Sequence, residues 1–146
     1  MPKVLLTGST GYIGSHTVVA LLEAGYQVVG VDNYSRSKPA IADRIREIAQ
    51  KDYHQYQADL TRKEELAKVL EQEGDISCVI HFAAFKAVGE STQHPLFYFQ
   101  NNLVGQMNLM KACEEHGMYF DAGEFTDYKY ETLMDKFRDF LIGNRG

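Results

Sequence analysis

Three glycines near the amino terminus have a type and spacing suited to chemistry. Gly8, Gly11 and Gly14 form the pattern GxxGxxG directly after a short apolar run, Lys3 to Thr7. A tight turn from a strand into a helix brings the backbone close to a pyrophosphate, and the helix N-terminus supplies amide donors and a favourable dipole. Side chains in the turn would block that approach. The pattern therefore predicts a dinucleotide phosphate site, and the alternative is a purely structural turn.

An acidic residue stands where such a site needs one. Asp32 follows the apolar run Gln27 to Val31 and comes 18 positions after Gly14. Its carboxylate would accept hydrogen bonds from the adenosine ribose and would repel a 2′-phosphate, so NAD is expected rather than NADP. Arg36 and Lys38 lie close by in the sequence, where they could soften this preference or could simply be solvated loop charges.

The elements that position these residues alternate between strand and helix. Gly25, Gly74 and Gly117 stand where three helices should end, and Thr61 with Glu64 predicts a capping box at the start of the third helix. The alternation predicts an α/β fold, a doubly wound parallel sheet of Rossmann type with strand order 3-2-1-4 and helices on both faces. The expected strands span 3–7, 27–31, 53–57 and 78–82, and the expected helices span 13–24, 41–49, 62–73 and 95–116.

The sheet is expected to be truncated after about four strands. Only Met118 to Phe120 could stand in for a fifth strand, so the outer edge of the fourth strand should remain open. We therefore divide the chain into a dinucleotide-binding half, residues 1–117, and a divergent tail, residues 118–146. The tail should contain one amphipathic helix, which packs on a nearby apolar surface or docks on a partner chain, either a second copy in a homo-dimer or another protein. Its apolar positions are Leu133, Met134, Phe137, Phe140 and Leu141.

The last expected helix of the first half, which begins at Pro95, contains residues that disfavour helices. Asn101 and Asn102 are poor helix formers, so a buried hydrogen-bonding role is expected for them. Gly105 costs about 1 kcal/mol relative to alanine in a helix, and a close contact with a strand would explain it.

Composition excludes several classes of function. The net charge of −5 over 146 residues argues against a nucleic-acid surface. Cys78 and Cys113 form no CxxC pair, so no zinc or redox motif and no metal site is expected. No apolar run approaches the ~20 residues of a membrane span. We expect a cytoplasmic protein that does not contact a membrane.

Several segments together resemble a known family. Residues 7–16, 31–33 and 58–60 (TGSTGYIGSH, VDN and ADL) are similar to extended short-chain dehydrogenase/reductase proteins. Residues 81–91, HFAAFKAVGES, and 98–102, YFQNN, resemble the UDP-glucose 4-epimerase group of that family. The related sugar dehydratases typically carry a different stretch after His-Phe-Ala-Ala. The resemblance covers residues 1 to about 117.

The resemblance implies NAD as cofactor and gives roles to particular residues. Gly8, Gly11, Tyr12, Ile13 and Gly14 would hold the pyrophosphate region, and Asp32 and Asn33 the adenosine ribose. Asp59 and Leu60 would flank the adenine. Phe82, Ala83 and Ala84 would line the channel toward the nicotinamide, with Lys86 and Asn101 at that end of the cofactor.

Catalytic residues, in contrast, are not found. The family's chemistry needs a tyrosine and a lysine four residues apart on one helix, with a serine or threonine nearby. The one formal match, Tyr34 and Lys38, precedes Pro39, which disfavours helical geometry at Lys38, and it lies beside Asp32 at the adenosine end. The C-terminal substrate domain is not expected in this chain either.

Three functions remain open from the sequence. A complete relative would interconvert UDP-glucose and UDP-galactose through transient oxidation at C4, but this chain alone should be inactive. It could instead be a non-catalytic module that binds NAD or a partner. A third alternative is another extended reductase or a sugar dehydratase.

Overall fold

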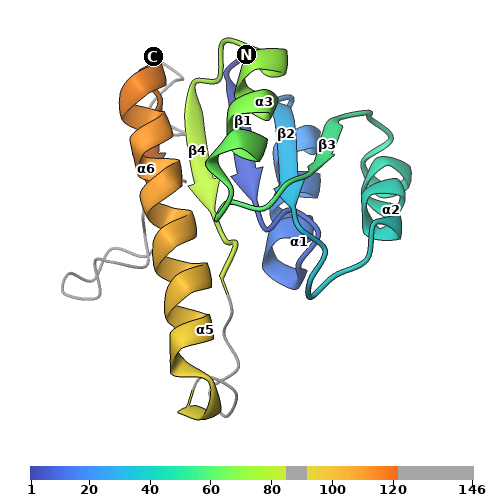
Figure 1. Ribbon diagram of the computed structural model, residues 1–146. Coiled ribbons are helices and arrows are strands. Elements are labelled where there is room, and N and C mark those ends of the chain that lie inside the picture. The colour runs from blue at the N-terminus through green and yellow to red at the C-terminus, as the bar shows by residue number, and fades with distance from the viewer. Residues whose placement is uncertain (85–91, 122–146) are drawn as a thin grey trace, which may run out of the picture.

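The computed structural model describes residues 1–84 and 92–121 (Figure 1). A parallel sheet forms its centre, with the strand order β3-β2-β1-β4-β5. The predicted α/β fold and the order 3-2-1-4 are confirmed. The strands are β1 (Lys3–Thr7), β2 (Gln27–Asp32), β3 (His54–Gln57), β4 (Cys78–His81) and β5 (Tyr119–Asp121).

Helices cover both faces of the sheet. Successive residues of β1 point to opposite faces, so Val4 and Leu6 pack with α1 and α2, whereas Leu5 packs with α3 and α6. All three side chains are buried, as expected of a central parallel strand. The helices are α1 (Tyr12–Glu23), α2 (Ala40–Ala49), α3 (Lys63–Glu73), α5 (Pro95–Phe99) and α6 (Gly105–His116), with a π-helical turn, η1 (Gln100–Val104), between the last two.

The expected open edge of the fourth strand is wrong. Cys78, Val79 and Ile80 of β4 pair in parallel with β5, whose three residues follow α6 directly. Three residues carry no periodic pattern of their own, and their pairing depends on the free backbone groups that β4 offers. The amphipathic helix predicted near Leu133 lies outside the described residues.

The capping box predicted at the start of the third helix is also wrong. Arg62, not Thr61, occupies the N-cap of α3, and its side chain makes no capping hydrogen bond. The amide and hydroxyl of Thr61 donate instead to Asp59 Oδ1, at 2.9 and 2.7 Å. The Thr61 hydroxyl thus donates to a charged acceptor two residues away and does not accept a hydrogen bond from an amide of the helix.

The glycines predicted to end helices do so. Gly25 and Gly117 have φ of +90° and +65°, in the left-handed region that favours glycine, and Gly74 caps α3. Pro95 lies in the first turn of α5 as expected. The long helix predicted over 95–116 is present, but its middle turn is π-helical.

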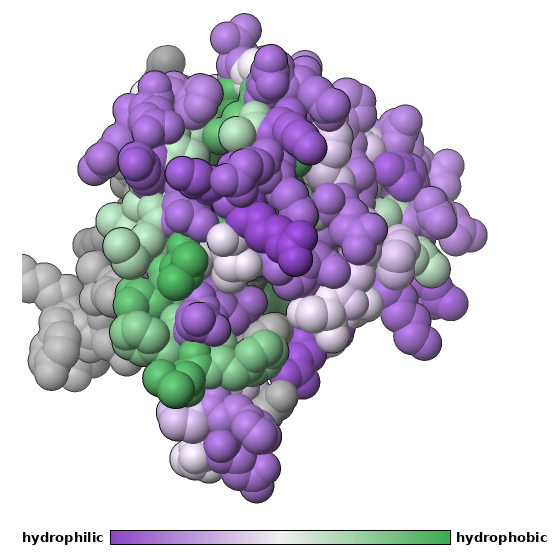
Figure 2. Space-filling view, in the orientation of Figure 1, coloured by the Kyte–Doolittle hydropathy of each residue, from purple (hydrophilic) through white to green (hydrophobic). Residues whose placement is uncertain are grey.

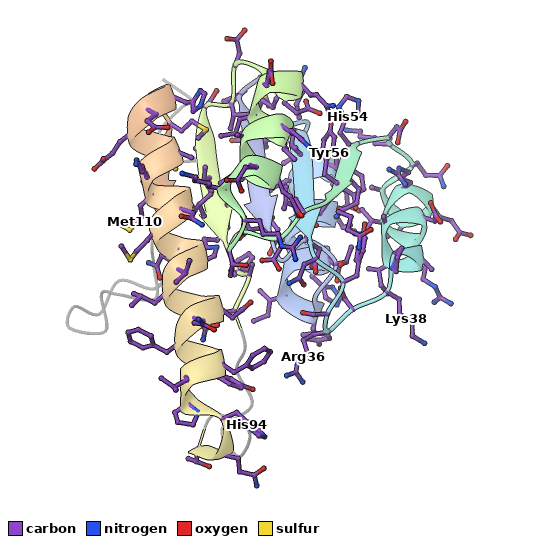
Figure 3. All side chains as sticks on the ribbon, in the orientation of Figure 1. Arg36, Lys38, His54, Tyr56, His94 and Met110 are labelled. Carbon is purple, nitrogen blue, oxygen red and sulfur yellow. The ribbon has the colours of Figure 1, made fainter. Side chains whose placement is uncertain are left out.

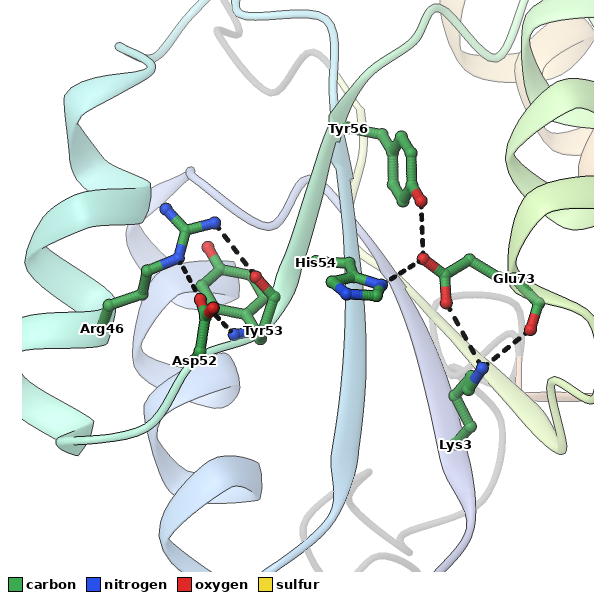
Figure 4. A network of polar contacts seen from close by, with 7 residues as sticks. All are labelled: Lys3, Arg46, Asp52, Tyr53, His54, Tyr56 and Glu73. Atoms are coloured by element: carbon green, nitrogen blue, oxygen red, sulfur yellow. Dashed lines mark hydrogen bonds and ion pairs between the residues drawn. The ribbon is translucent and has the colours of Figure 1, made fainter.

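A buried carboxylate links several elements at the amino ends of the strands (Figure 4). Glu73, at the end of α3, has a side chain only 4% exposed. Lys3 Nζ donates a hydrogen bond to the backbone oxygen of Glu73 at 2.7 Å and lies 3.3 Å from Glu73 Oε2. Tyr56 donates its hydroxyl to Oε1 at 2.6 Å, and His54 Nδ1 also lies 2.6 Å from Oε1.

These contacts decide the protonation of the carboxylate. Burial alone would raise the pKa of Glu73, but the hydrogen bonds from Tyr56, His54 and Lys3 outweigh it and hold that pKa below its ordinary value of 4.5. The hydrogen bond to the carboxylate raises the pKa of Tyr56 to about 12. The network therefore needs an ionised Glu73.

We expect Glu73→Gln to lower the free energy of unfolding at neutral pH by about 1–3 kcal/mol, because hydrogen bonds to a charged acceptor are weakened. A depressed carboxylate pKa contributes stability that is present above the unfolded value and lost as pH falls through the folded value. The difference between wild type and variant should therefore shrink below the ordinary pKa of 4.5.

Urea denaturation across this pH range measures that difference. Glu71→Gln, on the exposed side of the same helix, is the matched control and should follow wild type throughout. A difference that stays constant down to about pH 3 would contradict the assignment of the acid-sensitive stability to Glu73.

Candidate functional site

The glycines of the first loop are required for different reasons. Gly8 has φ of +70°, and a Cβ there would lie 2.8 Å from the amide nitrogen of Ala83. A Cβ on Gly14 would lie 1.9 Å from the carbonyl oxygen of Gly8. Gly11 differs, since a Cβ there would meet only the Gly8 oxygen, at 3.3 Å. Packing within the protein explains Gly8 and Gly14, while Gly11 borders open space.

Helix α1 begins directly after this loop. Gly11 is its N-cap and has no side chain to accept hydrogen bonds from the first amides. Tyr12 and Ile13, in the first turn, are exposed, and Gly14 is buried against the loop. The start of α1 thus offers amide donors that no side-chain cap satisfies.

Asp32 ends β2 beside this loop. Its Oδ2 accepts a hydrogen bond from the amide of Thr10 at 3.2 Å, and its Oδ1 accepts one from the amide of Tyr34 at 2.9 Å. The Thr10 hydroxyl lies 2.6 Å from the hydroxyl of Ser37, which joins the following loop to the glycine loop. Two backbone donors therefore fix the carboxylate in orientation while it borders the cleft described below.

The chain that leaves β4 lies against the same loop. The amide of Phe82 donates to the backbone oxygen of Thr7 at 3.1 Å, and the amide of Ala83 donates to its hydroxyl at 3.3 Å. The Thr7 hydroxyl also lies 2.5 Å from Nδ1 of His81. Fully buried Thr7 thereby positions residues 82–84 across the carboxyl end of β1.

A single cleft at the carboxyl ends of the strands brings most of the predicted residues together. Those that line it are Gly8, Gly11, Asp32, Asn33, Asp59, Leu60, Phe82, Ala83, Ala84 and Asn101. Tyr12, Ile13 and Gly14 follow Gly11 at the start of α1 and are not among the residues that line the cleft, and Lys86 lies outside the described residues.

The cleft also has walls that the sequence did not reveal. Ser35 and Ser37 line it, and Arg36 lies with them on the loop after β2, as Figure 3 shows for Arg36 and Lys38. The position of these serines depends on the contact between Thr10 and Ser37, which no local sequence pattern predicts. Thr10, 3% exposed, was missed for the same reason, because its amide acts through Asp32.

The α5–α6 helix closes the cleft on the side of Asp59. Gly105 lies against the loop after β3, where a Cβ would be 3.2 Å from the Cβ of Leu60. The close contact expected for Gly105 is therefore present, but with a loop rather than a strand. Asn108 Nδ2 donates to the backbone oxygen of Leu60 at 2.8 Å, which holds that loop to the helix.

The π-helical turn presents its amides at the same place. Asn101 Nδ2 donates to Asn102 Oδ1 at 3.2 Å, and both residues are half-buried. Asn101 also borders a second hollow that shares Asn33, Ser35 and Asp59 with the cleft, so the two are continuous. The second hollow has apolar walls from Phe97 and Val104.

The rejected catalytic pair is not on a helix. Tyr34, with φ of +59°, and Lys38 lie in the loop between β2 and α2, and α2 begins only at Ala40. Within residues 1–84 and 92–121, no group of three or more His, Cys, Asp and Glu side chains is placed to hold a metal ion. Over the same residues no helix has the length and apolar character needed to cross a bilayer.

Comparison with known proteins identifies the family. Residues 5–126 match the family model described as GDP-mannose 4,6 dehydratase. The chain belongs to this family. Within it, a UDP-glucose 4-epimerase of Bacillus subtilis is 48% identical over 115 residues, which are 79% of this chain and 34% of that protein. One from Drosophila melanogaster is 44% identical over 124 residues, covering 81% of this chain and 35% of the other.

Solved structures agree with the sequence matches. The UDP-glucose 4-epimerase of Stenotrophomonas maltophila, with bound NAD and formylated UDP-arabinopyranose, superposes with a TM-score of 0.77 at 38% identity, over 81% of this chain and 35% of that one. The enzyme of Bifidobacterium longum, in complex with NAD⁺ and UDP, has a TM-score of 0.77 at 37% identity, over 83% and 37%. The predicted resemblance is confirmed, and the chain spans about a third of the length of these family members.

The glycine geometry predicts two different outcomes for alanine substitutions. Gly14→Ala should lower the free energy of unfolding by about 3 kcal/mol or more, because the new methyl meets a backbone oxygen that cannot move independently. Gly11→Ala should cost less than about 1 kcal/mol, since the single close contact needs a shift of only a few tenths of an ångström.

Thermal unfolding of both variants beside wild type tests this difference. Equal destabilisation by the two substitutions would contradict the view that Gly14 is required by packing and Gly11 by the open space beside it.

Proposed function

We propose that this chain forms the NAD-binding part of a nucleotide-sugar 4-epimerase. The observation that carries the proposal is the cleft at the carboxyl ends of β1, β2 and β4. It joins a side-chain-free loop at the start of α1 to the fixed carboxylate of Asp32. This is the place and the donor set that a dinucleotide needs in an open parallel sheet. Solved relatives with bound NAD or NAD⁺ support the choice of cofactor.

The residues present fit such a cofactor. Gly11 leaves room for a close approach of the backbone, and the uncapped amides that follow suit a pyrophosphate. Asp32 retains acceptor capacity for ribose hydroxyls beyond its two backbone donors. Asp59 lies beside the apolar walls of Phe97 and Val104, which suit the faces of a purine.

We assign the roles on this basis. Gly8, Gly11, Tyr12, Ile13 and Gly14 surround the pyrophosphate, Asp32 and Asn33 hold the adenosine ribose, and Asp59 and Leu60 flank the adenine. Phe82, Ala83 and Ala84 line the path toward the nicotinamide. A role of Asn101 at the nicotinamide end stays a prediction from the resemblance, because Asn101 also borders the hollow beside Asp59. A contact of Lys86 with the nicotinamide-side ribose stays a prediction from the sequence.

The substrate of the complete protein is proposed to be UDP-glucose or UDP-galactose. When bound, the cofactor would supply reversible hydride transfer at C4 of the sugar. The segment HFAAFKAVGES favours an epimerase over a dehydratase, and the curated relatives with that activity match at 44–48% identity. The alternatives remain a non-catalytic module that binds NAD or a partner, and another extended reductase or sugar dehydratase. A homo-dimer and a cytoplasmic location stay predictions.

Calorimetric titration with NAD tests the cofactor site. We expect micromolar or tighter binding to wild type and binding weaker by about tenfold or more for Asp32→Ala, which removes charge-assisted hydrogen bonds to the ribose. The same substitution should narrow the preference for NAD over NADP, because the repulsion of a 2′-phosphate disappears.

Asp75→Ala is the matched control, since Asp75 is exposed and precedes β4 at the opposite end of the sheet. It should bind NAD as wild type does. Wild-type affinity in Asp32→Ala, or no binding to a folded wild type, would contradict the proposed site.

A complementation assay separates the epimerase from the binding module. The pure chain should not convert UDP-galactose, because we find no tyrosine and lysine four residues apart on one helix to move the proton that accompanies hydride transfer. Mixing it with the remaining two-thirds of a relative, which supplies such a helix, should restore turnover if the chain is part of an epimerase. Turnover by the chain alone would overturn the proposed inactivity, and a mixture that binds NAD without turnover would favour the module.

A further inference from the structure

A polar contact joins the edge strand β3 to the glycine loop, across the strand that lies between them. On the face of the sheet that carries α3 and α6, apolar surface gathers over the α5–α6 helix (Figure 2). The contact lies on the opposite face, where Tyr53 packs with residues of α1 and α2. There Ser9 Oγ donates a hydrogen bond to Gln55 Oε1 at 2.8 Å, although 46 residues separate the two in the sequence.

Gly30 makes room for this contact. It is the residue of β2 that pairs with Gln55 of β3 on one side and with Leu6 of β1 on the other. A Cβ on Gly30 would overlap Gln55 Oε1 and would lie 2.9 Å from Ser9 Oγ. Neighbouring strands are about 4.8 Å apart, so the Gln55 side chain has to cross β2 to reach the loop after β1. The missing side chain of Gly30 leaves that path open.

The acceptor in this contact receives two hydroxyl groups. Tyr53 also donates a hydrogen bond to Gln55 Oε1, at 3.0 Å. Burial raises the pKa of Tyr53 far above its ordinary value, so its hydroxyl stays protonated and available as a donor. A carbonyl oxygen has two lone pairs, and the two donors use both of them. The Tyr53 contact spans two residues of one segment, whereas the Ser9 contact reaches the glycine loop.

Ser9 stands between two residues that belong to the candidate site. Gly8 lines the cleft, and the amide of Thr10 donates to Asp32 Oδ2. Ser9 itself is fully buried, and neither Ser9 nor Gln55 lines the cleft. Any effect of this pair on a ligand in the cleft must therefore pass through the backbone of the loop.

We propose that Gln55 is a positioning residue for the cofactor. By holding Ser9 it keeps the glycine loop in the conformation that receives the pyrophosphate, so less order has to be gained when the cofactor binds. This inference rests on the proposed function, because it assigns the loop to NAD. It extends the site to an edge strand whose own residues do not line the cleft.

Calorimetric titration with NAD compares the two donors of Gln55. Ser9→Ala and Tyr53→Phe each remove one hydroxyl from the same acceptor, so the two substitutions are matched in chemistry. We expect Ser9→Ala to weaken NAD binding by about fivefold, because a hydrogen bond that orders the loop is lost, and Tyr53→Phe to change it by less than about twofold. Gln55→Met keeps the length of the side chain and removes the acceptor, so it should match Ser9→Ala.

The double variant that combines Ser9→Ala with Gln55→Met separates positioning from a general loss of structure. If Gln55 acts through Ser9, the double variant should bind NAD about fivefold more weakly than wild type and not about 25-fold, since the second substitution has no contact left to remove. Multiplication of the two effects would overturn the proposal. A Tyr53→Phe effect as large as that of Ser9→Ala would also overturn it.

Amide hydrogen exchange in the absence of NAD gives an independent readout. We expect the amide of Thr10 to exchange at least about fivefold faster in Gln55→Met than in wild type, because the loop opens more often once Ser9 is released. The amide of Val69, inside α3, should stay protected and shows that the variant is folded.

The two readouts distinguish this inference from the proposed function. Wild-type NAD affinity and wild-type exchange of Thr10 in Gln55→Met, with binding still weakened in Asp32→Ala, would overturn the role of Gln55 alone. A folded wild type that does not bind NAD would overturn the proposed function and with it the cofactor role of Gln55.

Discussion

The contact between two stretches of backbone, the glycine loop and the chain leaving β4, constrains the whole carboxyl edge of the sheet. Gly8 and Ala83 lie so close that no Cβ fits between them, and Gly14 lies closer still to the carbonyl oxygen of Gly8. Such contacts require β1 and β4 to be adjacent and parallel. They also require α1 to begin directly after the glycine loop. Because all the strands run in one direction, Asp32 and the residues after β3 then arrive at the same edge. The cleft follows from this arrangement.

The carboxylates at the two ends of the sheet differ in the groups that donate hydrogen bonds to them. At the amino ends, Glu73 is buried and its oxygens are occupied by side chains from β1 and β3. At the carboxyl ends, Asp32 accepts hydrogen bonds from two backbone amides and Asp59 accepts them from the amide and the hydroxyl of Thr61, and both carboxylates border the cleft. The first arrangement stabilises the fold, whereas the second leaves acceptors available to a ligand. Stability and binding are thus assigned to opposite edges of one sheet.

Local patterns were enough to predict most of the architecture. Apolar runs, helical spacing and terminal glycines depend on neighbours in sequence, so the first four strands, their order and the long helix were predictable. The position of Asp32 at the cleft followed from its place at the end of β2. Features decided by competition or by distant partners were not predictable. The Thr61 hydroxyl donates to Asp59 instead of accepting from the helix, β5 pairs with the edge that β4 offers, and Ser37 is held at the cleft by Thr10.

The π-helical turn sets the rotational phase between two halves of one helix. Its wider turn adds about one residue to the repeat of the α-helix. Phe97 on one side of the turn therefore faces the second hollow while Leu109 on the other faces the core, without a proline or a kink to redirect the chain. Deletion of a single residue between Gln100 and Val104 would rotate α5 against α6 by about 100°. The π-helical turn thus joins a segment that borders the binding surface to a segment that packs in the core.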